Sequence, residues 1–196
     1  MSDTPAPLGT DPGEDAIAGM ALFGRVLLQV DDEDLERETP CEGWDVQALI
    51  SHVVLADAAV PLLFAGEPLE ATMVIDTSIL GPNPVATWRG TALAAIEAFR
   101  APGAMEQSVQ HPIGARSGAV VARFRLVDLL AHTWDLATAI GVEIEIPEAL
   151  ADAALEFLYP MRDQLKESQV FGAPIAPPPD SGAVLRLLGL LGRTAW

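Results

Sequence analysis

Apolar residues recur three and four positions apart along most of this chain, which is the pattern of helices that bury one face. The pattern predicts four long helices, over residues 13–30, 46–64, 84–99 and 120–140. Signals at the ends agree: Asp45 suits an N-cap, Pro84 suits a first helical position, and Gly141 suits the residue after a helix. Residues 105–119 fit an irregular segment or a short hairpin, and no series of alternating strands appears. The pattern therefore predicts an all-α bundle.

The helical spacing continues after the fourth helix. Pro147 suits the start of a further helix, which Pro160 is expected to kink or split. A proline-rich patch then leads to a short terminal helix over residues 183–191. These segments predict a four-helix bundle with additional C-terminal helices. We expect residues 1–196 to form one domain, in which residues 1–12 are a loose arm.

Composition and charge restrict the class of protein. Half of the 196 residues are hydrophobic, and the formal charge of −17 argues against a nucleic-acid backbone or an anionic membrane as partner. The first residues lack the basic and apolar regions of a signal peptide. Asp57, Pro61 and Asp128 interrupt the longest apolar stretches, so no membrane span is expected. A single cysteine, Cys41, cannot form an internal disulfide, and we predict a cytoplasmic protein.

The fourth helix carries a polar stripe with metal-ligating chemistry. Asp128 and His132 are four residues apart, so both side chains project from one face, and Arg125 and Asp135 fall on the same side. A carboxylate and an imidazole one turn apart can supply half of a metal site. The alternative is that the stripe is merely the solvent-facing side of an apolar helix.

His52 lies on the second predicted helix, near the middle of the stripe that should face the core. Its neighbours on that face are Leu49, Ala56, Ala59 and Leu63, whereas Gln47, Ser51 and Asp57 are expected to point elsewhere. Such a residue is either a hydrogen-bonded core histidine or a ligand. Together with Asp128 and His132, it would give two imidazoles and one carboxylate, which is the donor set of an open metal site.

Other candidate chemistry is sparse. Cys41 could be a nucleophile only with a base beside it and a lowered pKa, and otherwise it is packed or inert. His111 precedes Pro112 and is interpreted as a surface-loop residue, with substrate contact as the alternative. The tryptophans of the helical segments are interpreted as core residues or pocket walls: Trp44, Trp88 and Trp134.

Three segments resemble a known family. Thr39 to His52, which begins Thr-Pro-Cys-Glu-Gly-Trp-Asp, is similar to the N-terminal signature of actinobacterial proteins related to mycothiol-dependent maleylpyruvate isomerase. Asp-Leu-Leu-Ala-His-Thr-Trp-Asp-Leu-Ala, from Asp128 to Ala137, is similar to a second signature within the wider DinB/YfiT-like superfamily. Residues 187–196 resemble the ending of a metal-binding subfamily of that group.

The resemblance implies a four-helix bundle that carries a divalent metal, with zinc as the first candidate and nickel as another. By matching position it implies His52, Asp128 and His132 as the ligands and mycothiol as co-substrate. The isomerase has Glu where this chain has Asp128, a shorter side chain that changes metal distance or denticity. The isomerase also carries a further C-terminal domain, for which the residues after Gly141 look too few and too helical.

These expectations combine into a functional hypothesis. The chain would be a metal-dependent thiol (mycothiol) transferase or isomerase that acts on a small electrophilic substrate. The alternatives are a non-catalytic metal- or ligand-binding bundle and a purely structural bundle. Its partners would be the small thiol and the electrophile, and a homodimer is compatible with the sequence. No catalytic residue is assigned, and Cys41 is expected to be dispensable for metal binding because three ligands already come from helices.

Overall fold

The computed structural model describes residues 7–67, 69, 75–168 and 171–195, and most of them are helical. The chain divides into two compact units. Residues Pro12–Ile144 form one, which we call the bundle unit. The residues through Asp11 and those from Glu145 onward form the other, the C-terminal unit. The all-α fold class is confirmed, whereas the assignment of the whole chain to one domain stays a prediction.

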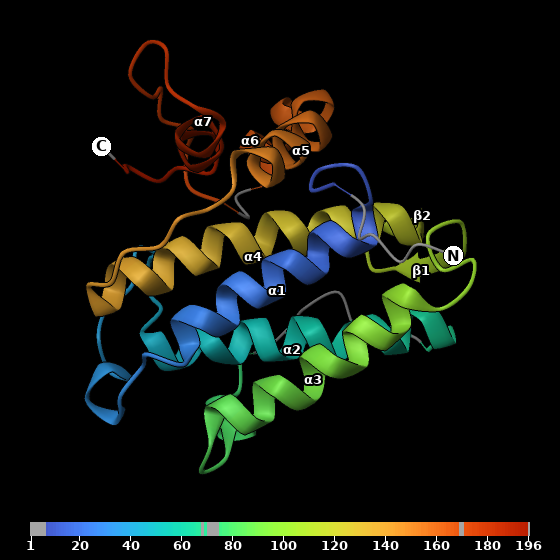
Figure 1. Cartoon of the computed structure of the whole chain (residues 1–196), viewed down its shortest axis with the longest axis horizontal. Helices are drawn as coiled ribbons and strands as arrows, with labels where there is room; N and C mark the ends of the chain where they lie inside the picture. Colours follow the sequence, from blue (N-terminus) through green and yellow to red (C-terminus); the bar gives the residue numbers. More distant parts are fainter. Residues whose placement is uncertain (1–6, 68, 70–74, 169–170, 196) are drawn as a thin grey trace. The chain divides into compact units, whose positions relative to one another are not determined.

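The bundle unit contains the four predicted long helices (Figure 1). Helix α1 packs mainly against α4 and α2 packs mainly against α3, while α1–α3 and α2–α4 contacts close the bundle. Apolar side chains from all four helices form its core, in which Met20, Phe23, Leu49, Ile50, Ala95 and Leu129 are almost completely buried. The helices span Pro12–Leu27 (α1), Val46–Ala65 (α2), Pro84–Arg100 (α3) and Gly118–Ile140 (α4).

The predicted helix ends are largely confirmed. The Asp45 side chain accepts a hydrogen bond from the Ala48 backbone at 2.7 Å and caps α2. Gly141 follows α4 with φ 73°, a left-handed conformation that favours glycine. Helix α1 ends at Leu27, three residues earlier than expected, and the acidic connection after it contains the short 3-10 helix η1, Asp32–Asp34.

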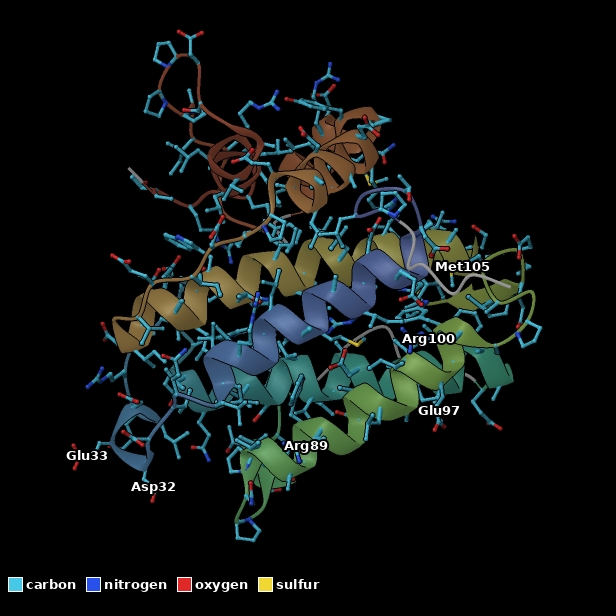
Figure 2. All side chains as sticks on the ribbon, in the orientation of Figure 1. Asp32, Glu33, Arg89, Glu97, Arg100 and Met105 are labelled. Carbon is cyan, nitrogen blue, oxygen red and sulfur yellow. The ribbon has the colours of Figure 1, made fainter. Side chains whose placement is uncertain are left out.

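That acidic connection is mostly exposed. Figure 2 shows the Asp32 and Glu33 side chains projecting from η1 away from the long helices. Asp34 differs because it is buried and pairs with Arg37 at 3.0 Å. Its carboxylate also accepts a hydrogen bond from the Asp31 backbone at 2.9 Å, which closes the turn.

Residues 105–119 contain the hairpin alternative. Strands β1 (Ser108–His111) and β2 (Gly114–Ser117) pair antiparallel, with Val109 opposite Arg116. His111 is partly buried, and its ring stacks on Phe124 of α4 with 5.7 Å between the ring centroids. The expectation of a surface-loop histidine is therefore wrong, because pairing of the two strands carries His111 onto the side of α4.

The C-terminal unit is also helical. Pro160 lies in the 3-10 helix η3, so the predicted split of this element is confirmed. The Glu148 carboxylate accepts a hydrogen bond from the Ala183 backbone at 2.5 Å, which places a negative charge at the start of the terminal helix. Residues 7–10 of the predicted loose arm form a turn, and residues 1–6 lie outside the described residues. The elements are α5 (Glu148–Leu158), η3 (Tyr159–Met161), α6 (Arg162–Ser168) and α7 (Ala183–Leu190).

Helix α2 has the length and apolar composition of a membrane span, and among the described residues it alone does. Core helices of soluble proteins meet the same criterion. Nine α2 residues are buried, and they include Asp57, which is paired with an arginine of α4. The contacts of α2 are therefore those of a core helix. The cytoplasmic location stays a prediction.

Candidate metal centre

Three side chains from two helices of the bundle unit converge on one point. His52 projects from α2, and Asp128 and His132 project from successive turns of α4. The Nε2 atom of His52 is 3.1 Å from Oδ1 of Asp128, and Nε2 of His132 is 3.3 Å from the same oxygen. All three potential ligand atoms lie within 4.8 Å of one another. The structure thus brings together all three residues that the sequence singled out.

The remaining polar atoms of the α4 pair are held by other residues. Arg125 Nη1 donates to Oδ2 of Asp128 at 2.5 Å, which leaves Oδ1 facing the two histidines. The Nδ1 atom of His132 is 3.1 Å from Oδ2 of the buried Asp135, which leaves Nε2 facing Asp128. A carboxylate behind a histidine fixes its tautomer and ring orientation, an arrangement that is common around metal ligands.

Arg125 is itself anchored from α2. Its Nη2 donates to Oδ1 of Asp57 at 2.7 Å, and the Asp57 carboxylate is completely buried. The expectation that Asp57 points away from the core is therefore wrong, because its charge is neutralised by an arginine 68 positions along the chain. Asp57 takes a place on the buried face, and His52 lies at the edge of that face with its side chain 17% exposed.

Trp44 covers two of the three side chains. Its ring lies 4.9 Å from the His52 ring and 5.6 Å from the His132 ring, measured between centroids, and it stacks on the latter. The loop before α2 fixes Trp44, because the Thr39 hydroxyl donates to the Trp44 carbonyl at 2.9 Å and accepts from the Cys41 backbone at 3.2 Å. Of the two interpretations of Trp44, the wall of a site fits these contacts.

Cys41 lies on the same loop, close to the second carboxylate of α4. Its Sγ is 3.7 Å from Oδ2 of Asp135, the oxygen that also contacts His132. Cys41, His132 and Asp135 form a second group whose ligand atoms lie within 4.8 Å of one another. Among the described residues, these two groups share His132, one on each side of its ring. Cys41 is therefore a neighbour of the candidate centre and not an isolated loop residue.

The electrostatics favour charged forms at the centre. Burial would raise the pKa of Asp128, but His52, His132 and Arg125 outweigh it and hold that pKa well below its usual range. Burial would lower the pKa of His132, but the Asp128 charge and hydrogen bonds to Asp128 and Asp135 raise it well above the usual value. Asp128 is therefore favoured as a carboxylate and His132 as an imidazolium, and a metal ion would have to displace the imidazolium proton.

The polar stripe of α4 does not face solvent. Arg125, His132 and Asp135 are all buried, and Asp128 is about one-fifth exposed. The interpretation of the stripe as the wet side of the helix is therefore wrong. His111 lies on the hairpin and is not part of either three-residue group. Its pKa is lowered, first by burial and then by the nearby Arg116 charge.

The role of Asp57 was not predicted from the sequence, and for Trp44 the wall of a pocket was one of two interpretations. The available signal for Asp57 was a single carboxylate inside an otherwise apolar helix, since such a charge must find a partner if it is buried. For Trp44, the signal was its position just before Asp45, the N-cap of the helix that carries His52. Neither signal names the partner residue.

The donor set fits a divalent metal ion. Two imidazole nitrogens and one carboxylate oxygen suit zinc and related ions, and three protein ligands leave a coordination position for an exogenous group. The fit rests on three ligand atoms within 4.8 Å of one another, with the opposite sides of Asp128 and His132 held by Arg125 and Asp135. The same arrangement without an ion is a buried hydrogen-bonded cluster of charged side chains.

Comparisons with known proteins agree with this architecture. The model of the mycothiol maleylpyruvate isomerase N-terminal domain matches residues 18–137, which contain all three candidate ligands. Two uncharacterized proteins of Mycobacterium tuberculosis are each 34% identical over 129 residues, covering 66% of this chain and 67% of theirs. A crystal structure of the mycothiol-dependent maleylpyruvate isomerase has a similar fold, with a TM-score of 0.70 at 20% identity.

The structural match covers 94% of this chain and 89% of the isomerase chain. The bundle unit alone is too short to supply that share, so the likeness of fold extends into the C-terminal unit. The expectation that the residues after Gly141 have no counterpart in the isomerase is therefore wrong. Short helices separated by proline-rich and irregular segments gave too little periodicity to identify that counterpart from sequence.

Proposed function

The chain belongs to the mycothiol maleylpyruvate isomerase N-terminal domain family, and on that premise we propose that it is a metal-dependent thiol transferase or isomerase. Its metal would be a divalent ion, with zinc as the first candidate, held by His52, Asp128 and His132. Mycothiol would be the thiol, and the second substrate would be a small electrophile. Function in the cytoplasm agrees with this proposal.

One observation carries the proposal. Nε2 of His52, Oδ1 of Asp128 and Nε2 of His132 lie within 4.8 Å of one another, although their residues come from two different helices. A divalent ion could replace the contacts that now join these atoms, in which Nε2 of His52 and Nε2 of His132 lie 3.1 Å and 3.3 Å from Oδ1 of Asp128. Two histidines and one carboxylate are also the ligand types of several catalytic zinc sites.

The chain's own residues then have distinct tasks. His52, Asp128 and His132 bind the ion, which when bound would lower the pKa of a coordinated thiol or water toward neutrality. Asp135 contacts Nδ1 of His132 and so directs Nε2 at the site, where an ion would take the place of the Nε2 proton. Trp44 packs against both imidazole rings and restricts their rotation. We assign no general acid or base.

Two measurements test the proposal in sequence. Metal analysis of the purified protein should give close to one divalent ion per chain, and the ion should be lost from His52→Ala, Asp128→Ala and His132→Ala. A conjugation or isomerisation assay with mycothiol and a panel of small electrophiles should then show turnover that a chelator abolishes. An absence of bound metal in the wild type would overturn the whole proposal.

The non-catalytic alternative gives a different result in the same experiments. A metal- or ligand-binding bundle without a reaction would retain the ion and its dependence on the three residues, but it would show no turnover with any electrophile. The open coordination position expected for a three-ligand site favours catalysis, since structural zinc sites are usually closed by four protein ligands.

A further inference from the structure

The buried ion pair between Asp57 and Arg125 lies directly behind the candidate ligand Asp128. Arg125 donates through Nη2 to Oδ1 of Asp57 at 2.7 Å and through Nη1 to Oδ2 of Asp128 at 2.5 Å. The guanidinium therefore bridges a carboxylate of α2 and a carboxylate of α4. Its side chain is 7% exposed and that of Asp57 is 0% exposed, so both charges are removed from water.

Stability alone is a poor explanation for this pair. Desolvation of two charges costs several kcal/mol per ion, and well-packed apolar residues often replace such pairs without loss. The cost is not fully recovered here, because Arg125 Nε is buried without a hydrogen-bond partner among the described residues. Burial raises the pKa of Asp57 above its usual value and Arg125 opposes this rise, so the ionised carboxylate is held at a cost.

The geometry points to a task at the neighbouring ligand. We propose that Arg125 and Asp57 are positioning residues. Arg125 holds the Asp128 carboxylate in place, and Asp57 compensates the charge of Arg125, so that a net negative charge remains to bind the ion. Arg125 occupies Oδ2 of Asp128, so that Asp128 binds through the single oxygen Oδ1. This inference rests on the proposed function, since it assumes that Asp128 is a ligand.

The charge balance of Asp57, Arg125 and Asp128 gives Asp57 a role in metal binding. A buried arginine next to Asp128 alone would neutralise that carboxylate and repel a divalent cation. With Asp57 present, two carboxylates share one guanidinium, and one negative charge remains for the ion. Asp57 therefore compensates Arg125, while Arg125 fixes the direction of Asp128. The two links between α2 and α4, His52 with Asp128 and Asp57 with Arg125, would act together.

The bundle unit offers a matched control on the other side of α4. Arg123 Nη1 is paired with Oδ2 of Asp15 in α1 at 2.7 Å, and Asp15 is 1% exposed. Asp15→Asn and Asp57→Asn thus remove the same charge from a buried carboxylate paired with an arginine of the same helix. Among the residues that the structure describes, neither Asp15 nor Arg123 belongs to a three-residue ligand group. A general effect of lost stability should appear in both variants.

The experiment measures Zn²⁺ affinity of the purified, metal-stripped full chain by competition with a chromophoric chelator. We expect Asp57→Asn to weaken Zn²⁺ binding by about 10- to 100-fold, the usual size for a residue behind a ligand. Asp15→Asn should stay within about twofold of the wild type, as expected for a distant independent site. Equal affinity of Asp57→Asn and wild type, or equal losses in both variants, would overturn the inference.

Co²⁺ substitution gives a second readout that a merely structural role would not change. Arg125→Lys keeps the charge but cannot bridge two carboxylates as a planar fork does. With Oδ2 of Asp128 released, the visible absorption of bound Co²⁺ should shift and change in intensity, whereas Asp15→Asn should reproduce the wild-type spectrum. An unchanged spectrum in Arg125→Lys would overturn the single-oxygen assignment.

The outcomes separate this inference from the proposed function. A wild type that binds no Zn²⁺ overturns the function, and the inference with it. A wild type that binds Zn²⁺ while Asp57→Asn and Arg125→Lys bind it equally well overturns the inference alone. If Asp57→Asn does not fold, Arg125→Lys decides by the same affinity comparison. If neither variant folds, the pair is required for the fold itself and the positioning role is rejected.

Discussion

Helix α4 meets a buried aspartate of a neighbouring helix in two places. Toward α1, Arg123 pairs with Asp15, and toward α2, Arg125 pairs with Asp57, each across 2.7 Å. The two pairs are alike in residue types, distance and burial of the carboxylate. They differ in their surroundings. Arg125 also pairs with Asp128, which contacts the two histidines, whereas among the described residues neither Asp15 nor Arg123 is part of a three-residue ligand group.

This difference shows what identifies a candidate site in a helical bundle. A buried ion pair by itself is compatible with a purely structural contact between helices. On the α2 side, however, three ligand atoms lie within 4.8 Å of one another, and the outer polar atoms of Asp128 and His132 are held by Arg125 and Asp135. The two regions therefore differ in whether ligand atoms converge on one point, because both contain buried charge.

The largest expected effect is one that the two regions share. Asp15→Ala and Asp57→Ala should each lower the free energy of unfolding of the metal-free protein by about 3–5 kcal/mol, because each breaks an ion pair whose carboxylate is buried. The loss should be greater for Asp57, since the side chain of Arg125 is 7% exposed and that of Arg123 is 16% exposed. Urea denaturation in the presence of a chelator measures both. A loss below about 1 kcal/mol in either would contradict the description of that pair.

The second effect separates the regions. His52→Ala, Asp128→Ala and His132→Ala should each weaken metal binding by more than about 100-fold, beyond the usual effect of residues behind a ligand. Metal at about 100 times its dissociation constant stabilises a protein by about 2.7 kcal/mol. A chelator should therefore lower the melting temperature of the wild type and of Asp15→Asn, but not of the three ligand variants. Full metal content in His52→Ala would remove His52 from the ligand set.

The elements of the fold could be predicted because their signals are local. Periodic apolar positions and caps such as Asp45 and Gly141 specify where helices begin and end, and most of the described elements follow them. The pair Asp128 and His132 could be recognised for the same reason, because both lie on one helix. The sequence also offered His52 as a third ligand, and the resemblance to the family implied it too, although the sequence pattern does not determine its distance from that pair.

The surroundings of the site could not be predicted in the same way. Asp57 and Arg125 are 68 positions apart in the sequence, and Cys41 and Asp135 are 94 apart. Contacts at such separations produce no periodic pattern in the sequence. A polar residue in an apolar helix indicates only that it is either exposed or paired. For Asp57, exposure was the simpler expectation, and the structure shows the paired form.

A third prediction concerns pH and the metal-free protein. Burial would lower the pKa of His132, but Asp128 and Asp135 raise it above the unfolded value of about 6.5. Its contribution to stability is then fully present below pH of about 6.5 and is lost as pH rises through the folded pKa. Metal affinity should increase over the same range, because the competing proton leaves.

Denaturation of chelator-treated protein at several pH values measures this contribution, which changes by at most about 1.4 kcal/mol per pH unit for one proton. His132→Gln should lack the component that the wild type loses above neutrality. Asp15→Asn should keep it, since Asp15 pairs with Arg123 and belongs to neither of the groups that contain His132. A His132→Gln profile parallel to that of the wild type would show that the His132 pKa is not raised.

The smallest expected effect belongs to Cys41, and it tests which three-residue group binds the ion. Its Sγ lies 3.7 Å from Asp135, which holds His132 from behind, so Cys41 is one contact further from the ion than Asp135. Cys41→Ser replaces the thiol with a hydroxyl that can donate to the same carboxylate. Zn²⁺ affinity should therefore change by less than the roughly tenfold expected for a residue directly behind a ligand. Zinc competition on wild type and variant measures this.

Release of the metal at unchanged stability would move the ion to the other side of the His132 ring, to the group formed by Cys41, His132 and Asp135. In that case His52→Ala should retain the metal, so the two variants together decide between the groups.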